Sequence, residues 1–261
     1  MLSIATIDTS TAAPKYAKER CEDKCGNVWI PYPFGIGSNC SVNEWYTVDC
    51  NSSTPYLRAL NHLEVLGVDI ENQTVTVNTP KISDCSQTDS IDLGRSPFFY
   101  SKLQNKFVFE GCGNAVMMEH GSLITGCSTT CGNDSVSHTN NCLGIGCCQT
   151  TLPHHLKSYH TNLTSLETLG DSACRHALLV DKASYSEGRF SVANDNSYVP
   201  VSLLWTLSDS DSEKLSCCSY SLSRIKVDMG NGNSMDSWKC IYNVFAESKG
   251  NPYLGDGCHC K

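Results

Sequence analysis

Long apolar segments are missing from this sequence of 261 residues. The most hydrophobic stretch, VPVSLLWTL at 199–207, is far shorter than the roughly 20 residues that a membrane-spanning helix needs, so the sequence predicts no membrane span. Residues 1–20 likewise lack the apolar core of about 7–15 residues that a signal peptide contains, and we expect them to form an N-terminal tail.

Positive charge is also scarce. The chain has 19 Lys and Arg against 27 Asp and Glu, a net charge of -8, and charged residues make up only 18% of it. Proteins that bind nucleic acids depend on clustered Lys and Arg to displace counterions from phosphates. The composition therefore predicts no nucleic-acid partner.

Motifs of the common enzyme families are absent as well. The sequence contains no G-x-S-x-G, H-E-x-x-H or P-loop pattern, and GIGSNC and GIGCC lack the later glycine and lysine of phosphate-binding loops. His154 and His155 are adjacent, and neighbouring residues of a strand point to opposite faces, so they do not read as a metal pair. We expect the chain not to be an enzyme.

Cysteine, in contrast, is abundant, with 17 residues. Two pairs, Cys21 with Cys25 and Cys127 with Cys131, have a spacing that zinc ligands also use, but the other cysteines are scattered singly between strand-like runs, which favours disulfides. Neighbouring Cα atoms lie about 3.8 Å apart, closer than a relaxed disulfide allows, so the members of each adjacent pair need different partners. The predicted disulfide cysteines are Cys21, Cys25, Cys40, Cys50, Cys85, Cys112, Cys127, Cys131, Cys142, Cys147, Cys148, Cys174, Cys217, Cys218 and Cys240.

So many disulfides imply an oxidising compartment, and hence passage through the secretory route. Seventeen is an odd number, so at least one cysteine has no partner within the chain. Five N-glycosylation sequons agree with a secreted protein. They stand at Asn39, Asn51, Asn72, Asn133 and Asn162.

Strand patterns dominate the sequence, which predicts a mainly β, disulfide-rich fold of two cysteine-rich modules with short strands and long loops. Residues 62–80 alternate apolar and polar side chains around Glu71-Asn72-Gln73 and predict a hairpin, and residues 115–127 predict a second hairpin that turns at 119–121. Residues 222–240 are rich in Gly, Asn and Ser, and we expect a long loop there.

Cysteine spacing suggests the organisation of the chain. Cysteines are sparse from Cys25 to Cys112, and six of them then fall between Cys112 and Cys148. We therefore expect a first domain at 21–113, a second cysteine-rich domain at 114–240 and a short final segment at 241–261.

The segment CGNVWIPYPFGIG at 25–37, followed by Cys40 and Cys50, resembles the start of the galacturonan-binding domain of plant wall-associated receptor kinases. The resemblance continues through LEVLGVDIENQTVTV at 63–77 and PFFYSKLQNKFVFEGCGN at 97–114. Further on, CLGIGCCQTTLP at 142–153 and CRHALLVDKASY at 174–185 resemble the family's second cysteine-rich module, and GNPYLGDGC at 250–258 resembles the run before its EGF-like repeats. The EGF-like repeats, membrane helix and kinase of that family are not recognisable in these residues.

This resemblance implies an extracellular domain facing the cell wall, of a kind that family members anchor in the plasma membrane, which binds pectin, polygalacturonan and its oligomers. The ligand would be a polyanion, yet residues 21–113 hold six Lys and Arg against eleven Asp and Glu. Because charges are screened over about 8 Å in physiological salt, a local basic cluster can still hold carboxylates. Arg95, Lys102 and Lys106 fall within twelve residues and are expected to flank one hairpin. No cofactor is expected, although calcium shared between pectin and protein carboxylates is a second route to binding.

The aromatic residues of the 25–37 segment have two interpretations. Pro31 and Pro33 favour an extended backbone, and Phe34 is expected in the core. Trp29 and Tyr32 either fill the core or present flat faces on which sugars stack, so we keep both as candidate ligand residues. A protein-interaction module that binds a peptide or a second receptor is the alternative function.

Overall fold

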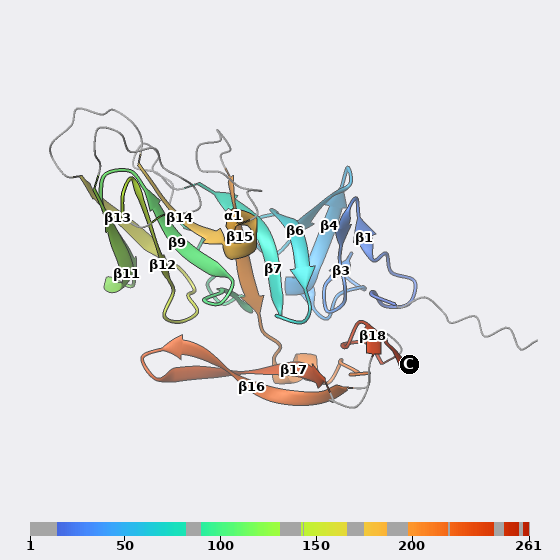
Figure 1. The fold of residues 1–261 in the computed structure, drawn as a ribbon. Coiled ribbons are helices and arrows are strands. Elements are labelled where there is room, and N and C mark those ends of the chain that lie inside the picture. The colour runs from blue at the N-terminus through green and yellow to red at the C-terminus, as the bar shows by residue number, and fades with distance from the viewer. Residues whose placement is uncertain are drawn as a thin grey trace, which may run out of the picture.

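The computed structural model describes residues 15–81, 90–130, 142, 144–165, 175–186, 198–218, 220–242, 248–255 and 258–260. Within them the protein is mainly β, as predicted, with nineteen strands and three helices of at most five residues. Figure 1 shows two groups of strands side by side, with a long two-stranded ribbon crossing beneath them.

The largest sheet has seven strands in the order β3-β4-β5-β6-β7-β15-β8. Only β3 and β4 run parallel, and every other neighbouring pair is antiparallel. The bounds are Gly35–Ile36 for β3, Thr47–Asn51 for β4, Thr54–Leu57 for β5, Leu63–Asp69 for β6, Thr74–Pro80 for β7, Tyr198–Trp205 for β15 and Phe98–Tyr100 for β8.

The predicted hairpin at 62–80 is confirmed as β6 and β7. Its turn is stabilised by the Asp69 carboxylate, which accepts hydrogen bonds from the backbone N–H groups of Glu71 and Asn72 at 2.9 Å each. Val75 and Val77 face the core and are fully buried, as the alternating pattern requires.

Strand β15 enters this sheet from far along the chain. It lies between β7 and β8, and Val201 pairs with Val77 while Leu203 pairs with Val75. Five consecutive residues from Val199 are buried, which is typical of a strand covered on both faces. The sheet therefore contains strands from both of the segments that we expect to be domains, and the boundary near residue 113 stays a prediction.

Two three-stranded sheets form the second group. One has the order β12-β9-β14 and the other β11-β10-β13. The predicted turn at 119–121 is confirmed, because β10 and β11 form an antiparallel hairpin there. The bounds are Asn105–Glu110 for β9, Gly113–Glu119 for β10, Ser122–Thr129 for β11, Cys147–Thr151 for β12, His160–Ser165 for β13 and His176–Asp181 for β14.

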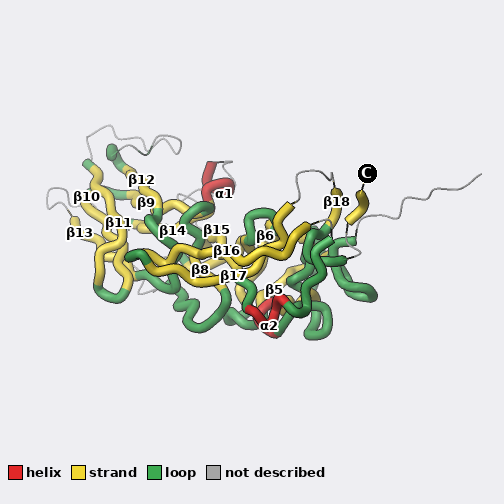
Figure 2. The backbone as a smooth tube through the Cα atoms, turned by 90° about the horizontal axis from the view of Figure 1, so that it is seen from below, coloured by secondary structure: helices red, strands yellow, loops and turns green. Residues whose placement is uncertain are grey.

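The prediction of a loop at 222–240 is wrong. Strands β16 (Tyr220–Gly230) and β17 (Asn233–Tyr242) form an antiparallel ribbon instead, which Figure 2 shows from below. The Gly, Asn and Ser residues belong to its turn, where Gly230, Asn231 and Gly232 all have positive φ angles. An Asn-Gly pair favours that left-handed geometry and is a strong hairpin signal, which composition alone conceals.

Smaller elements complete the described chain. Strands β1 and β2 pair with each other, as do β18 and β19. Their bounds are Lys24–Cys25, Val28–Trp29, Ser248–Gly250 and Cys258–Cys260, and the helices are the 3-10 turn η1 (Glu44–Tyr46), α1 (Lys182–Ser186) and α2 (Asp209–Ser212). None of the helices in these ranges is long and apolar enough to cross a membrane.

Aromatic rings fill the core beneath the large sheet. Phe34 is fully buried, as expected, with its ring centroid 5.1 Å from that of Tyr46 and 5.9 Å from that of Trp205. Trp205 in turn lies 5.4 Å from Tyr253. Edge-on contacts of this kind stabilise aromatic clusters beyond the area that they bury. The first segment of the chain, β15 and the residues after 250 thus share one core.

Five disulfides are defined between described residues. They join Cys21 to Cys40, Cys25 to Cys50, Cys127 to Cys148, Cys142 to Cys147, and Cys217 to Cys240. Cys112 and Cys218 are also disulfide-bonded, whereas Cys85, Cys131 and Cys174 lie outside the described residues. Adjacent Cys147 and Cys148 have different partners, as predicted, and neither Cys21 nor Cys25 is available to zinc.

Candidate functional site

The three basic residues predicted to flank one hairpin do not do so. Arg95 precedes β8 and Lys106 lies in β9, and these two strands belong to different sheets. Lys102 stands in the turn that connects them. Although the three residues are close in sequence, they do not flank one hairpin.

Lys102 is already engaged by a carboxylate. Its ammonium lies 2.5 Å from Asp228 Oδ2 on β16 and donates to the carbonyl of Pro153 at 3.3 Å. The same carboxylate has its pKa lowered, chiefly by this hydrogen bond. Lys102 thus fixes the tip of the ribbon to the body of the protein.

Lys106 lies over an aromatic ring rather than in a basic cluster open to a ligand. Its ammonium is 3.9 Å from the centroid of the Tyr185 ring on α1. Burial lowers the pKa of Lys106, and the nearby charge of Lys182 lowers it further. A cation held over an aromatic face in this way contributes mainly to packing.

Arg95 has a different environment, because it lines a cleft with a volume of about 530 Å³. Five separate parts of the chain build this cleft: η1, the turn before β8 with the start of that strand, the segment between β12 and β13, the segment from the end of β15 to just beyond α2, and β17. Its lining residues are Asn43, Glu44, Trp45, Gly94, Arg95, Ser96, Pro97, Phe99, Lys157, Thr206, Leu207, Ser208, Ser210, Asp211, Lys214, Met235 and Asp236.

The Arg95 side chain is exposed and forms no ion pair or hydrogen bond with any residue that the structure describes. Most other cations nearby are satisfied internally. Lys157 donates to the carbonyl oxygens of Ser96 and Phe98, and Lys214 donates to that of Val42 at 3.1 Å. Arg95 therefore offers a planar cationic group whose donors have no partner among the described residues, which suits a carboxylate ligand.

Hydrogen bonds between distant segments hold the walls of the cleft in place. The Asn43 side chain caps the start of η1 by accepting a hydrogen bond from the N–H of Trp45 at 2.9 Å. The same side chain donates to the Asp211 carboxylate at 2.8 Å. Asp211 also accepts from both the backbone N–H and the hydroxyl of Ser208, at 3.0 and 2.7 Å, in the capping box of α2. The Tyr46 hydroxyl donates to the carbonyl of Thr206. These contacts leave Trp45 half-buried at the cleft.

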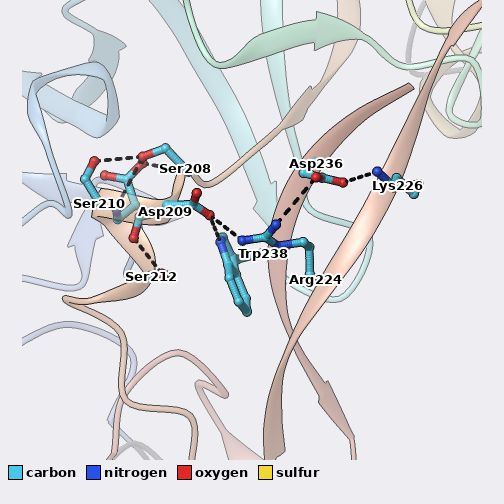
Figure 3. Close-up of polar contacts among 9 residues, drawn as sticks. Ser208, Asp209, Ser210, Ser212, Arg224, Lys226, Asp236 and Trp238 are labelled. Atoms are coloured by element: carbon cyan, nitrogen blue, oxygen red, sulfur yellow. Dashed lines mark hydrogen bonds and ion pairs between the residues drawn. The ribbon is translucent and has the colours of Figure 1, made fainter. Parts of the chain in front are cut away.

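Figure 3 shows how the ribbon side of the cleft is neutralised. Asp236 is paired with Lys226 at 2.6 Å and lies 3.6 Å from Arg224. Arg224 also reaches Asp209 at 3.1 Å, and Asp209 accepts from the indole N–H of Trp238 at 2.7 Å. With Asp236 paired and Asp211 saturated, the exposed Glu44 is the one cleft carboxylate without a side-chain partner among the described residues.

The two aromatic candidates differ in exposure. Trp29 is 46% exposed, whereas Tyr32 is 1% exposed. The Tyr32 hydroxyl donates to the carbonyl of Lys214 at 3.3 Å, and the Lys18 ammonium lies 4.7 Å from the ring centroid. Tyr32 thus supports the core beneath α2 and presents no free ring face, because its surroundings cover it.

The sequons can also be placed. The side chains of Asn39, Asn51, Asn72 and Asn162 are exposed, and Asn133 lies outside the described residues. Asn72 donates to Asp69 at 2.7 Å from the turn of the β6–β7 hairpin. These positions leave room for glycans, and their occupancy stays a prediction.

In the part of the chain that the structure describes, no three His, Cys, Asp or Glu side chains gather as metal ligands would. Trp45, Lys157 and Lys214 were missed at the sequence level, since nothing in their local patterns separates them from core or solvated residues. The only local hint is the position of Trp45 between Cys40 and Cys50.

Comparison with known proteins shows which proteins the chain is similar to. Residues 21–79 match the family profile described as wall-associated receptor kinase galacturonan-binding. The Arabidopsis thaliana proteins wall-associated receptor kinase-like 1 and wall-associated receptor kinase-like 5 are each 30% identical to the chain over 91% of its length. Wall-associated receptor kinase-like 6 from the same plant is 29% identical over 99% of it.

The chain spans 38% of the length of the first two relatives and 47% of the third. No solved structure matches it significantly.

Proposed function

We propose that the protein binds de-esterified polygalacturonan and its oligomers without catalysis. The starting point is the match of residues 21–79 to the galacturonan-binding domain of the wall-associated receptor kinase family. The observation that carries the proposal is Arg95, a cation with free donors in a cleft that also presents Trp45. Trp45, Asn43 and Glu44 belong to the matched domain, and Arg95 lies beyond it.

The cleft has the features that an acidic sugar needs. Its volume of about 530 Å³ falls within the roughly 300–1,000 Å³ of ordinary ligand sites. A galacturonate carboxylate would accept two parallel hydrogen bonds from the Arg95 guanidinium in a bidentate pair. The indole of Trp45 would contact the C–H groups of the sugar ring, and the hydroxyl of Ser210 lies at the same cleft to bond ring hydroxyls.

Two further cations line the cleft and would support an anion there. Burial lowers the pKa of Lys157 to about 8, so this side chain is charged in neutral and acidic solution and loses its charge above that pH. Affinity for a polyanion should accordingly fall as the pH rises through 8. The net charge of the chain opposes binding, but its effect is screened beyond about 8 Å in physiological salt.

The test is binding of the whole chain to immobilised polygalacturonate, with highly methyl-esterified pectin as the comparison. Arg95→Gln should weaken binding about tenfold, the usual effect of removing one charge-assisted pair. Arg58→Gln is the matched control, because Arg58 is an exposed arginine that pairs with Asp49 outside the cleft. Equal affinity for both pectins, or full binding by Arg95→Gln, would contradict the proposal.

The same experiment separates the two electrostatic routes. Binding through Arg95 should weaken with salt and survive a calcium chelator, whereas a calcium bridge would involve Glu44 and disappear on chelation. Release of reducing ends from polygalacturonate would contradict the non-catalytic part of the proposal. The setting that fits the disulfides, sequons and relatives is the extracellular, wall-facing part of a receptor.

A protein partner is the second candidate function, and the ribbon favours it. Strands β16 and β17 pair only with each other among the described strands, so an extended peptide could add to the free parts of their outer edges. Other parts are occupied, because the N–H of Trp238 donates to the carbonyl of Leu207 and the carbonyl of Asp228 accepts from the N–H of His155. Proteins captured from wall extracts after pectinase treatment would support this function, provided that ribbon-edge substitutions abolish the capture.

A further inference from the structure

A second exposed feature lies outside the cleft, at the start of the described chain. Trp29 on β2 is 46% exposed, more than any of the other three tryptophans. The ring of Tyr16 lies 5.1 Å from it, centroid to centroid, at an interplanar angle of 48°. The Lys24 ammonium lies 4.1 Å from the centroid of the same indole, and unlike Lys106 over the buried ring of Tyr185, both partners here are exposed to solvent. None of these three residues lines the cleft.

The local fold holds these groups in fixed positions. Lys24 and Trp29 are directly opposite each other in the β1–β2 hairpin, and the buried Cys25 ties that hairpin to Cys50. Gly26 forms the turn with φ of +58°, and a Cβ there would come within 2.1 Å of the Ser53 carbonyl oxygen. Only glycine allows this close approach.

The backbone of Tyr16 is held in place by hydrogen bonds as well. Its carbonyl accepts from the N–H of Tyr32 at 2.9 Å and from the Asn251 side chain at 2.8 Å. Asn251 is fully buried. Tyr16 is therefore attached to the core on one side, and its ring meets Trp29 on the other.

The charge of Lys24 has no counterpart. Among the described residues, no carboxylate pairs with Lys24 or with the neighbouring Arg20, both of which are exposed. Glu22 and Asp23 lie in the same segment, so the net local charge is small and the attraction for an anion acts only at close range. A ligand must therefore combine an apolar face for the indole with a negative group for the lysine.

We infer that Tyr16, Trp29 and Lys24 form a second saccharide-contact platform, which takes one uronic acid residue of an acidic polysaccharide. The C–H face of the pyranose ring packs on the exposed indole, and the carboxylate at its rim pairs with Lys24, whose flexible side chain moves aside from the ring. The ligand class rests on the proposed function, whereas the surface is separate from the cleft.

Two sites on one chain would act together on a polymer. Binding of one polygalacturonate strand at the cleft raises the local concentration of further uronate residues near the platform, so that the polymer binds more tightly than either site alone would allow. Oligomers too short to reach both sites gain nothing from the second site. The platform therefore predicts a dependence of affinity on ligand length.

Indole N–H resonances of the whole chain give a direct test, because each site contains its own tryptophan. Trigalacturonate titrated into the protein should shift the Trp29 signal if the platform binds and the Trp45 signal if the cleft binds, with the fully buried Trp205 as the unmoved reference. A shift of the Trp29 signal supports the platform even when the Trp45 signal does not move. An unmoved Trp45 signal would contradict binding at the cleft and leave the platform unaffected. A silent Trp29 overturns the platform whatever Trp45 does.

Affinity for immobilised polygalacturonate tests the same point by mutation. Trp29→Ala should weaken binding about five- to tenfold, since a stacked aromatic contact and a cation near it together contribute about that much. Lys24→Gln should weaken it about twofold and reduce its salt dependence.

Tyr198→Ala is the matched control, because Tyr198 is an aromatic residue of β15 that is 56% exposed and is neither in the platform nor in the cleft. Binding by Trp29→Ala within twofold of the unaltered chain, with the fold intact by circular dichroism, would overturn the platform.

Discussion

The side-chain amide of Asn43 donates a 2.8 Å hydrogen bond to the carboxylate of Asp211, joining residues 168 positions apart in the sequence. Asn43 begins η1 in the galacturonan-binding domain, and Asp211 belongs to α2, which follows β15. Both residues line the cleft. The contact thus fixes the distance between two walls that the chain builds separately.

Asn43→Ala should therefore destabilise the fold and weaken ligand binding together. The substitution removes the cap of η1 and leaves Asp211, which is 5% exposed, with one donor fewer. We expect a loss of about 1–3 kcal/mol in the free energy of unfolding, measured by urea denaturation of protein made without glycans. Asn39→Ala, at an exposed residue with no side-chain partner among the described residues, should change it by less than about 0.5 kcal/mol.

Gly230→Ala should detach the tip of the β16–β17 ribbon. Gly230 and Gly232 have similar φ angles of +81° and +74°, so alanine is strained at both. A Cβ on Gly230 would also come within 2.6 Å of the His154 ring, whereas one on Gly232 meets nothing within 4 Å. Gly230→Ala should be more destabilising than Gly232→Ala by about 1–3 kcal/mol, the range of an overpacked contact. Equal losses in thermal unfolding would show that the tip does not pack on His154.

Acidification should destabilise the protein through His155. Burial lowers the pKa of this side chain from 6.5 to about 4, and the charge of Lys102 adds to the shift, against the opposing effect of Asp228. Above pH 6.5 the residue is neutral in both states. Between pH 6.5 and 4 this histidine is protonated in the unfolded chain but stays neutral in the folded chain. The free energy of unfolding therefore decreases as the pH is lowered through this window.

We expect the fall to reach about 2–3 kcal/mol. In the native chain, Nδ1 of His155 accepts a hydrogen bond from the backbone N–H of Lys102 at 3.2 Å. His155→Asn retains an acceptor for this N–H and should remove that part of the pH dependence. His120→Asn is the control, at an exposed turn residue with φ of +49°, which asparagine tolerates. An unchanged slope in His155→Asn would contradict the assignment.

The disulfides should contribute according to the loops that they close. The Cys25–Cys50 bond spans 25 positions and the Cys142–Cys147 bond spans 5. Replacing both cysteines of the first pair with alanine should cost about 1 kcal/mol more than the same change in the second, by the loop-closure relation. Guanidinium unfolding of the two variants under non-reducing conditions would measure this difference, and the opposite order would show that native packing dominates over chain entropy.

Several features were predictable from local sequence because short-range physics decides them. The alternation at 62–80 fixed one buried face and gave the β6–β7 hairpin, and the cysteine content required disulfides whose adjacent members have different partners. The segment at 25–37 identified the family, and its Phe34 proved to be a core residue. At 222–240 the same kind of information was present in the Gly-Asn-Gly turn, but composition concealed it.

The sequence by itself determined a mainly β, disulfide-rich protein whose residues 21–79 resemble a galacturonan-binding domain, since strand periodicity, cysteine number and a family motif are local properties. Tertiary structure alone decided which residues meet. It separated Arg95 from Lys102 and Lys106, buried Tyr32, and placed β15 between β7 and β8. The cleft exists because five distant segments pack against one core, and no local pattern records contacts made across 168 residues.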